Sequence, residues 1–312
     1  MKQKSQNRFL AALLAVAMML QMLPMLAFAE DATYVAWNKD KKNKGYTTLK
    51  EAVDEADSGN TIILGEGSYT LYKSGSKTSG KDLTFVGKGP DKTIWQIGPE
   101  VPNPKLFGSE YNGDYSFDGA GKITFKNMKL CTGAKDYLGF IRPDQTVVDH
   151  CEIYGRASYW GYTSAVFTDT TFYAPPFDYA IWTYSSPTMI FDNCTFNTTG
   201  KAVNVYTDFS AGKHDITVYF NNCTVNSSIL NKQALNINDS NMRPYKYIIH
   251  IDNPQTIDAA LSNTTCSQLF GFKEDKSTGF TGNTGYTDVY LNGDLVWTNG
   301  KMKTHSYTVG EK

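Results

Sequence analysis

A six-residue unit that recurs through the middle of the chain constrains the fold more than any other feature. Each unit has a large apolar residue first, Asn, Asp or His third, a small or medium residue fourth, and an apolar residue sixth. The five units are Phe125–Leu130, Val148–Ile153, Phe167–Phe172, Phe191–Phe196 and Phe220–Val225. They begin 19 to 29 residues apart. Such a period is typical of solenoids, in which each coil contributes short strands joined by loops of variable length.

The pattern inside each unit predicts which residues face the core. Apolar residues at positions one, four and six should point inward, around a turn at position three. Asn and Asp suit that turn because they tolerate left-handed backbone, and we expect His150 to act there in the same way. Stacked coils lie about 4.8 Å apart, so the first residues of the five units should all point into one continuous core.

The cysteines follow the same repeat. Cys151, Cys194 and Cys223 all occupy position four, which predicts that they stack in one buried ladder. The chain has five cysteines, so at least one thiol is unpaired, and the pattern does not demand disulfides. No Cys-x-x-Cys or Cys/His spacing indicates zinc, and we expect no metal or other cofactor.

The two ends of the solenoid carry their own signals. Thr48 to Glu51 forms a capping box ahead of apolar residues at helical spacing, which predicts a short amphipathic helix over the first coil. Four strands are expected next, at Thr61–Leu64, Tyr69–Tyr72, Leu83–Val86 and Thr93–Ile97. Near the C-terminus, Val289–Leu291 and Leu295–Trp297 flank Asn292-Gly293 and predict a β-hairpin, which either caps the last coil or begins a further module.

Composition and the N-terminal segment indicate where the protein works. Basic residues, an apolar run from Phe9 to Leu20 and the small-x-small sequence ending at Ala29 are typical of a signal peptide. The predicted organisation is 1–29 signal peptide, 30–272 solenoid with its capping helix, and 273–312 Gly/Thr-rich linker with hairpin tail. A net charge of −1 argues against nucleic acid or anionic membrane as partner. We expect a monomer that is secreted and extracellular or held at the cell surface, with no membrane insertion after cleavage.

The first part of the solenoid resembles a known superfamily. Thr48–Ala56, Gly59–Leu64, Gly67–Tyr69, Leu83–Gly89 and Asp91–Ile94 look like the opening of pectin-lyase-like proteins, among which pectin methylesterases and secreted bacterial β-helix proteins open most similarly. The resemblance covers about residues 45 to 270. It implies an all-β, single-stranded right-handed parallel β-helix, and a bacterial protein. A fold of this kind does not by itself determine the function of a protein.

The catalytic motifs of that superfamily are incomplete in this sequence. Asp178 resembles a methylesterase aspartate, but the Arg and Gln segments of those enzymes are missing, and Asp136 repeats the same pattern one double coil earlier. The paired Asp and Gly-His-Gly of polygalacturonases are absent. Val147–Cys151 is similar to a pectate-lyase segment, which implies Asp149 as a Ca²⁺ ligand and Arg142 as the base, although the repeat itself explains these positions. A polysaccharide lyase, or less readily a methylesterase, therefore remains the alternative to a non-catalytic protein.

Residues suited to sugar binding recur in register instead. Aligning the coils on the cysteine column predicts an outward strip of aromatic and polar side chains on one sheet. Aromatic faces stack on sugar rings, while Asn and Asp bond hydroxyl groups. We predict polysaccharide or host-glycan binding by this strip, although aromatic ladders can also simply brace a sheet. The predicted binding residues are Trp160, Trp182, Tyr184, Asn204, Tyr206, Asp208 and Asn238.

Overall fold

A computed structural model describes most of the chain from residue 34 onward. The described residues are 34–70, 77–97, 117–132, 137–154, 156–159, 161–174, 179–182, 187–198, 201–206, 215–225, 235–238, 246–254, 287–298 and 301–302. The predicted signal peptide 1–29 and the predicted linker up to residue 286 lie outside them. The chain from Val35 onward forms one compact unit. Among the described residues, no helix is both long and apolar enough to cross a membrane.

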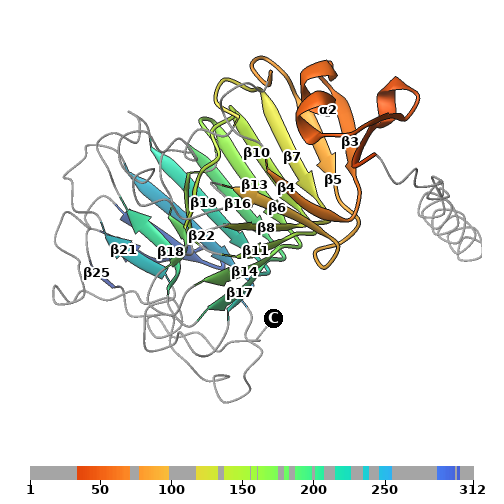
Figure 1. The fold of residues 1–312 in the computed structure, drawn as a ribbon. Coiled ribbons are helices and arrows are strands. Elements are labelled where there is room, and N and C mark those ends of the chain that lie inside the picture. Colours follow the sequence, from red (N-terminus) through yellow and green to blue (C-terminus); the bar gives the residue numbers. More distant parts are fainter. Residues whose placement is uncertain are drawn as a thin grey trace, which may run out of the picture. The chain divides into compact units, whose positions relative to one another are not determined.

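Strands dominate the structure, and most of them pair in parallel in three sheets (Figure 1). The prediction of an all-β chain with long parallel sheets is confirmed. The thirteen-stranded sheet contains, in spatial order, β2 (Lys44–Tyr46), β1 (Ala36–Asn38), β3 (Asn60–Leu64), β5 (Leu83–Val86), β7 (Lys122–Lys126), β10 (Gln145–Asp149), β13 (Ser164–Thr168), β16 (Thr188–Asp192), β19 (Ile216–Asn221), β22 (Tyr247–Asp252), β23 (Thr287–Leu291), β24 (Asp294–Thr298) and β25 (Lys301–Met302).

The two smaller sheets are parallel throughout. The seven-stranded sheet contains β4 (Gly67–Thr70), β6 (Thr93–Ile97), β8 (Lys129–Thr132), β11 (Glu152–Tyr154), β14 (Thr171–Ala174), β17 (Thr195–Thr198) and β20 (Thr224–Val225). The five-stranded sheet contains β9 (Tyr137–Phe140), β12 (Arg156–Tyr159), β15 (Tyr179–Trp182), β18 (Lys201–Tyr206) and β21 (Leu235–Asn238).

The chain visits the three sheets in a fixed order. From β7 to β21, each set of three successive strands places one strand in the thirteen-, the seven- and then the five-stranded sheet. We call each such set a circuit. Five circuits follow one another in this way, and each of the five sequence units begins inside the first strand of a circuit.

The first residues of the units form the predicted core. Phe125, Val148, Phe167, Phe191 and Phe220 pair in register across β7, β10, β13, β16 and β19. Their side chains are buried, and the rings of Phe167, Phe191 and Phe220 stack with nearly parallel planes. Parallel pairing places identical residues directly over one another, so one repeated apolar position yields a continuous core.

The third residue of every unit turns the chain as expected. Asn127, His150, Asp169, Asn193 and Asn222 all have positive φ, between 48° and 54°. Asn, Asp and His are the non-glycine residues that adopt this left-handed conformation most readily. The turn joins the thirteen-stranded sheet to the seven-stranded sheet. Asn253 and Asn292, which directly follow β22 and β23, also have positive φ.

The position-four cysteines are buried, as predicted, and their thiols are free. Cys151, Cys194 and Cys223 donate from Sγ to the carbonyl oxygens of Phe125, Phe167 and Phe191 in the preceding circuit, at 3.7, 3.4 and 3.4 Å. Burial raises the pKa of Cys151 to about 12. Because the thiolate is the reactive form of cysteine, this raised pKa lowers the reactivity of Cys151 in the folded state.

The predicted capping helix is present as α2 (Leu49–Glu55). Thr48 accepts from the backbone of Glu51, and the Glu51 carboxylate accepts from Thr48 N–H, so both halves of the capping box form. Leu49, Ala52 and Val53 are buried in the core.

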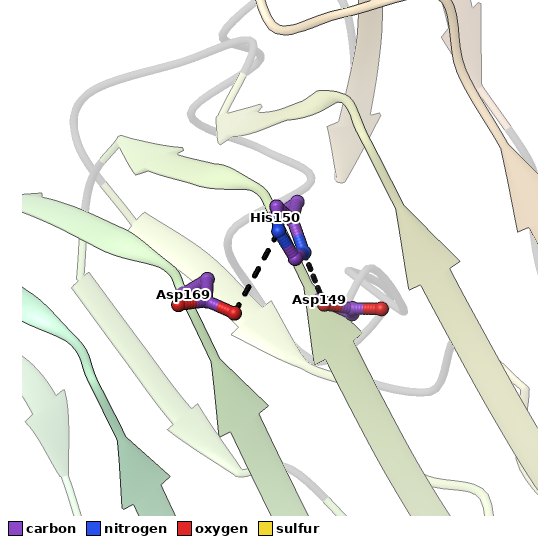
Figure 2. Close-up of side chains that lie close together, drawn as sticks. All are labelled: Asp149, His150 and Asp169. Carbon is purple, nitrogen blue, oxygen red and sulfur yellow. Dashed lines mark hydrogen bonds and ion pairs between the residues drawn. The ribbon is translucent and has the colours of Figure 1, made fainter. Parts of the chain in front are cut away.

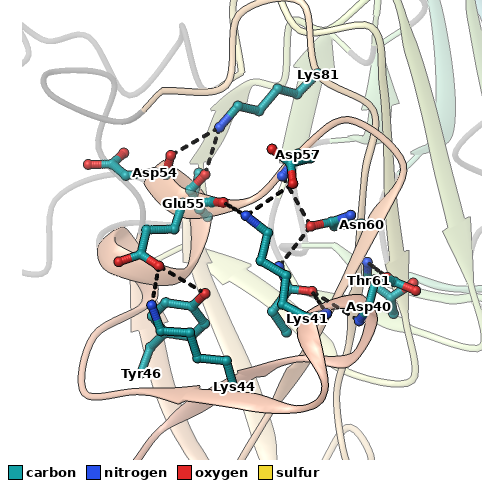
Figure 3. A network of polar contacts seen from close by, with 12 residues as sticks. Asp40, Lys41, Lys44, Tyr46, Asp54, Glu55, Asp57, Asn60, Thr61 and Lys81 are labelled. Atoms are coloured by element: carbon teal, nitrogen blue, oxygen red, sulfur yellow. Dashed lines mark hydrogen bonds and ion pairs between the residues drawn. The ribbon is translucent and has the colours of Figure 1, made fainter.

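Lysines satisfy the carbonyl groups at the other end of α2 (Figure 3). Lys41 Nζ donates to the Glu55 carbonyl, and Lys81 Nζ donates to those of Val53 and Asp54 at 3.0 and 3.3 Å. Cationic donors complement the negative end of the helix dipole. The short helix is therefore bonded at both ends.

Antiparallel hairpins lie at both ends of the thirteen-stranded sheet. The sequence analysis missed the N-terminal one, in which β1 pairs antiparallel with β2 and with β3 around a short 3-10 helix, Lys39–Lys41. The predicted C-terminal hairpin is confirmed as β23 and β24. Strand β23 also pairs in parallel with β22, so this hairpin continues the sheet.

Gly87 marks a place where two backbones approach closely, and it provides a stability prediction. A Cβ atom there would lie 2.6 Å from the Asn127 carbonyl oxygen and 2.8 Å from Thr93 Cβ. We expect Gly87→Ala to lower the free energy of unfolding by about 1–3 kcal/mol through overpacking, measured by urea denaturation. The control Asp91→Ala, at an exposed position nearby, should stay within about 0.5 kcal/mol of wild type. Equal stability of the two variants would contradict the close approach.

Candidate functional site

The five-stranded sheet carries four of the predicted glycan-binding residues. Strand register places Trp182 of β15 beside Asn204 of β18, and Tyr206 of β18 beside Asn238 of β21. For these strands the structure describes the backbone, so these are positions along the sheet. Three further predicted binding residues, Trp160, Tyr184 and Asp208, lie outside the described residues.

The strand register pairs each of the two aromatic binding residues predicted on this sheet with an asparagine. Trp182 and Tyr206 each have an asparagine as a neighbour in the adjacent strand. Aromatic and amide residues are the types that suit pyranose rings, through stacking and hydrogen bonding respectively, and on this sheet they occupy paired positions.

Aromatic residues also stack on the other two sheets, and the sequence analysis missed them. Tyr219, His250 and Tyr290 stack on the thirteen-stranded sheet, with ring centroids 4.9 and 5.0 Å apart. Tyr154 and Tyr173 stack at 4.4 Å on the seven-stranded sheet. Such rings cover one another's faces and are less suited to stacking on a sugar. Tyr219 directly precedes the first residue of its unit. A closer look at this position was the sequence signal that could have identified the stack of Tyr219, His250 and Tyr290.

Arg142, the candidate base of the lyase alternative, belongs to a polar cluster with Tyr162 and Asp118. Its guanidinium donates a hydrogen bond to the Tyr162 hydroxyl and lies 5.1 Å from the centre of that ring. Tyr162 donates in turn to Asp118 at 3.2 Å, and Arg142 Nε lies 3.9 Å from the same carboxylate.

The surroundings of Tyr162 favour the neutral form of its phenol. Burial raises the pKa of Tyr162 despite the neighbouring Arg142, so the phenol is neutral. Arg142 is therefore equipped to donate hydrogen bonds, and Tyr162, which is 38% exposed, presents a ring edge or face to solvent next to it.

Asp149, the candidate Ca²⁺ ligand, lies in a second polar cluster at the end of β10 (Figure 2). Lys126 Nζ lies 2.8 Å from one carboxylate oxygen, and His150 Nδ1 lies 2.5 Å from the other. His150 Nε2 faces Asp169 of the next circuit at 3.6 Å. Burial raises the pKa of Asp149, but Lys126 and His150 outweigh it, and the net pKa is below the usual range.

Arg142 and Asp149 are not brought together. Arg142 precedes β10 and Asp149 is the last residue of β10, and this five-residue strand alone spans about 13 Å. The third catalytic candidate, Asp178, lies outside the described residues. Within the described part of the chain, Asp149, His150 and Asp169 are the group of His, Cys, Asp and Glu side chains close enough to share a metal ion.

Comparisons with known proteins give no further assignment. No family model, no curated protein and no solved structure matches this chain.

Proposed function

We propose that the three sheets form a single right-handed parallel β-helix of the pectin-lyase-like class. The fixed order of the sheets along the chain supports this, because a coil of three strands repeats it at every turn. The buried ladder of unit-first residues and the column of left-handed Asn, Asp and His residues support it further.

The proposed function is binding of polysaccharide or host glycan by the five-stranded sheet, without cleavage. The observation that carries it is the register that sets Trp182 beside Asn204 and Tyr206 beside Asn238. Arg142, Tyr162 and Asp118 add hydrogen-bonding groups close to where β9 and β12 end. The protein acts outside the cell as a monomer, after export by residues 1–29.

The separation of Arg142 from Asp149 favours binding over the lyase alternative. Proton abstraction by a base helps only when the base reaches the same sugar ring that the metal holds. Two groups at opposite ends of β10 do not meet that requirement.

Alanine substitutions on the sheet test this function. The mature chain from residue 30 is titrated with pectins, glucans and host-type glycans by affinity electrophoresis and calorimetry. Trp182→Ala and Tyr206→Ala should each weaken binding by about 1 to 3 kcal/mol, because each removes a stacking surface.

Tyr173→Ala is the matched control, since Tyr173 stacks on Tyr154 in a different sheet. Its affinity should equal that of the wild type, and thermal unfolding confirms that all variants are folded. Unchanged affinity in both test variants would mean that the aromatic residues only brace the sheet. Formation of shortened or unsaturated oligosaccharides that stops with Arg142→Ala would support the lyase alternative.

A further inference from the structure

We propose that His150 and Asp169 form a binding site for a divalent transition metal ion such as Zn²⁺, with Asp149 and Asn193 as the residues that orient them. The proposal is independent of glycan binding. It concerns the turn column between the thirteen- and seven-stranded sheets, where His150 and Asp169 occupy equivalent positions of neighbouring circuits (Figure 2).

The backbone holds the two side chains in place. Both residues have positive φ, 53° for His150 and 48° for Asp169. His150 N–H donates to the Thr168 carbonyl at 3.1 Å, and Asp169 N–H donates to the Asp192 carbonyl at 3.1 Å. Each turn is thus tied to the next circuit, so the two side chains start from neighbouring, fixed points.

The gap between the two ligand atoms fits a metal ion better than a direct contact. His150 Nε2 and Asp169 Oδ2 lie 3.6 Å apart, which is longer than a hydrogen bond. Zinc lies about 2.0–2.2 Å from such N and O ligands, and a tetrahedral angle then separates them by about 3.4 Å. A metal ion would therefore bridge them with little movement.

Each proposed ligand has the partner that metal ligands usually have. His150 Nδ1 lies 2.5 Å from Asp149, and a proton on Nδ1 leaves the Nε2 lone pair directed toward Asp169. Lys126 holds the other oxygen of Asp149 at 2.8 Å. On the far side, the Asn193 amide donates to Asp169 Oδ1, which leaves Oδ2 for the metal.

The ligand types indicate the class of ion. Imidazole nitrogen with carboxylate oxygen suits Zn²⁺, Co²⁺ or Ni²⁺, whereas Ca²⁺ takes oxygen ligands. The His150 side chain is 67% exposed, so water can complete the coordination. Asparagine occupies most other positions of the column and adopts the same left-handed conformation. The turn therefore does not require the imidazole of His150.

A Zn²⁺ titration of the intact mature chain tests the site. Affinity is measured by competition with a chromogenic chelator, and X-ray absorption of the Zn²⁺ complex reports the ligand atoms. We expect one ion bound through N and O ligands. His150→Asn, which restores the usual residue of the column, should abolish binding, and Asp169→Asn should do the same independently.

Asp149→Asn tests the orienting role and should weaken Zn²⁺ binding by about 10–100-fold. His250→Phe is the control, because it removes another imidazole but keeps a ring between Tyr219 and Tyr290, and its affinity should be unchanged. Circular dichroism verifies the fold of each variant. Sulfur ligation, equal binding by His150→Asn and Asp169→Asn, or no binding at millimolar Zn²⁺ would overturn the proposal.

Discussion

Replacing Cys223 with aspartate is expected to prevent the chain from folding. Cys223 is 2% exposed, and its Sγ lies 3.4 Å from the Phe191 carbonyl oxygen and 3.5 Å from that of Asn221. A carboxylate at this position would face these carbonyl oxygens inside the core. An unpaired buried charge costs several kcal/mol, on the order of the roughly 5–15 kcal/mol that stabilises a typical domain.

The neighbouring residue provides the control for this prediction. Asn222 is exposed, has positive φ and accepts a hydrogen bond from Asn253 at 2.8 Å. Aspartate tolerates the same turn and keeps the acceptor, so Asn222→Asp should fold normally. Circular dichroism and soluble yield of the two variants compare them directly. A folded Cys223→Asp protein would show that position four does not face the core.

Truncation of Phe191 should give the second large effect, a loss of about 3–5 kcal/mol in the free energy of unfolding. Its ring stacks on Phe167 at 5.0 Å and on Phe220 at 4.9 Å, with planes 5° apart in both pairs. It also meets Phe172 and Phe196 edge-on. Phe191→Ala would leave a cavity in the middle of the ladder, and guanidinium chloride unfolding measures its cost.

Ile190→Ala is the matched control for Phe191→Ala. Ile190 precedes Phe191 on β16, and its side chain is half-buried on the opposite face of the strand. Its truncation removes fewer buried contacts and should cost about 1 kcal/mol or less. If the two substitutions cost the same, the assignment of inward and outward faces on β16 would be wrong.

The sequence by itself determined the features that repeat. The apolar first position, the Asn-type third position and the small fourth position of each unit predicted the core ladder, the turn column and the buried cysteines. The capping box at Thr48 predicted α2. These features depend on local periodicity and on parallel pairing in register, which act the same way in every circuit.

Only the tertiary structure decided which non-repeating side chains meet. Asp118, Arg142 and Tyr162 cluster although loops of different length separate them. His150 and Asp169 were expected simply as turn residues, but the structure directs Nε2 of one toward the other. A repeat sets the backbone position of each residue, whereas side-chain rotamers and neighbours in adjacent circuits set the contacts. These contacts depend on how neighbouring circuits pack together, so the sequence period could not reveal them.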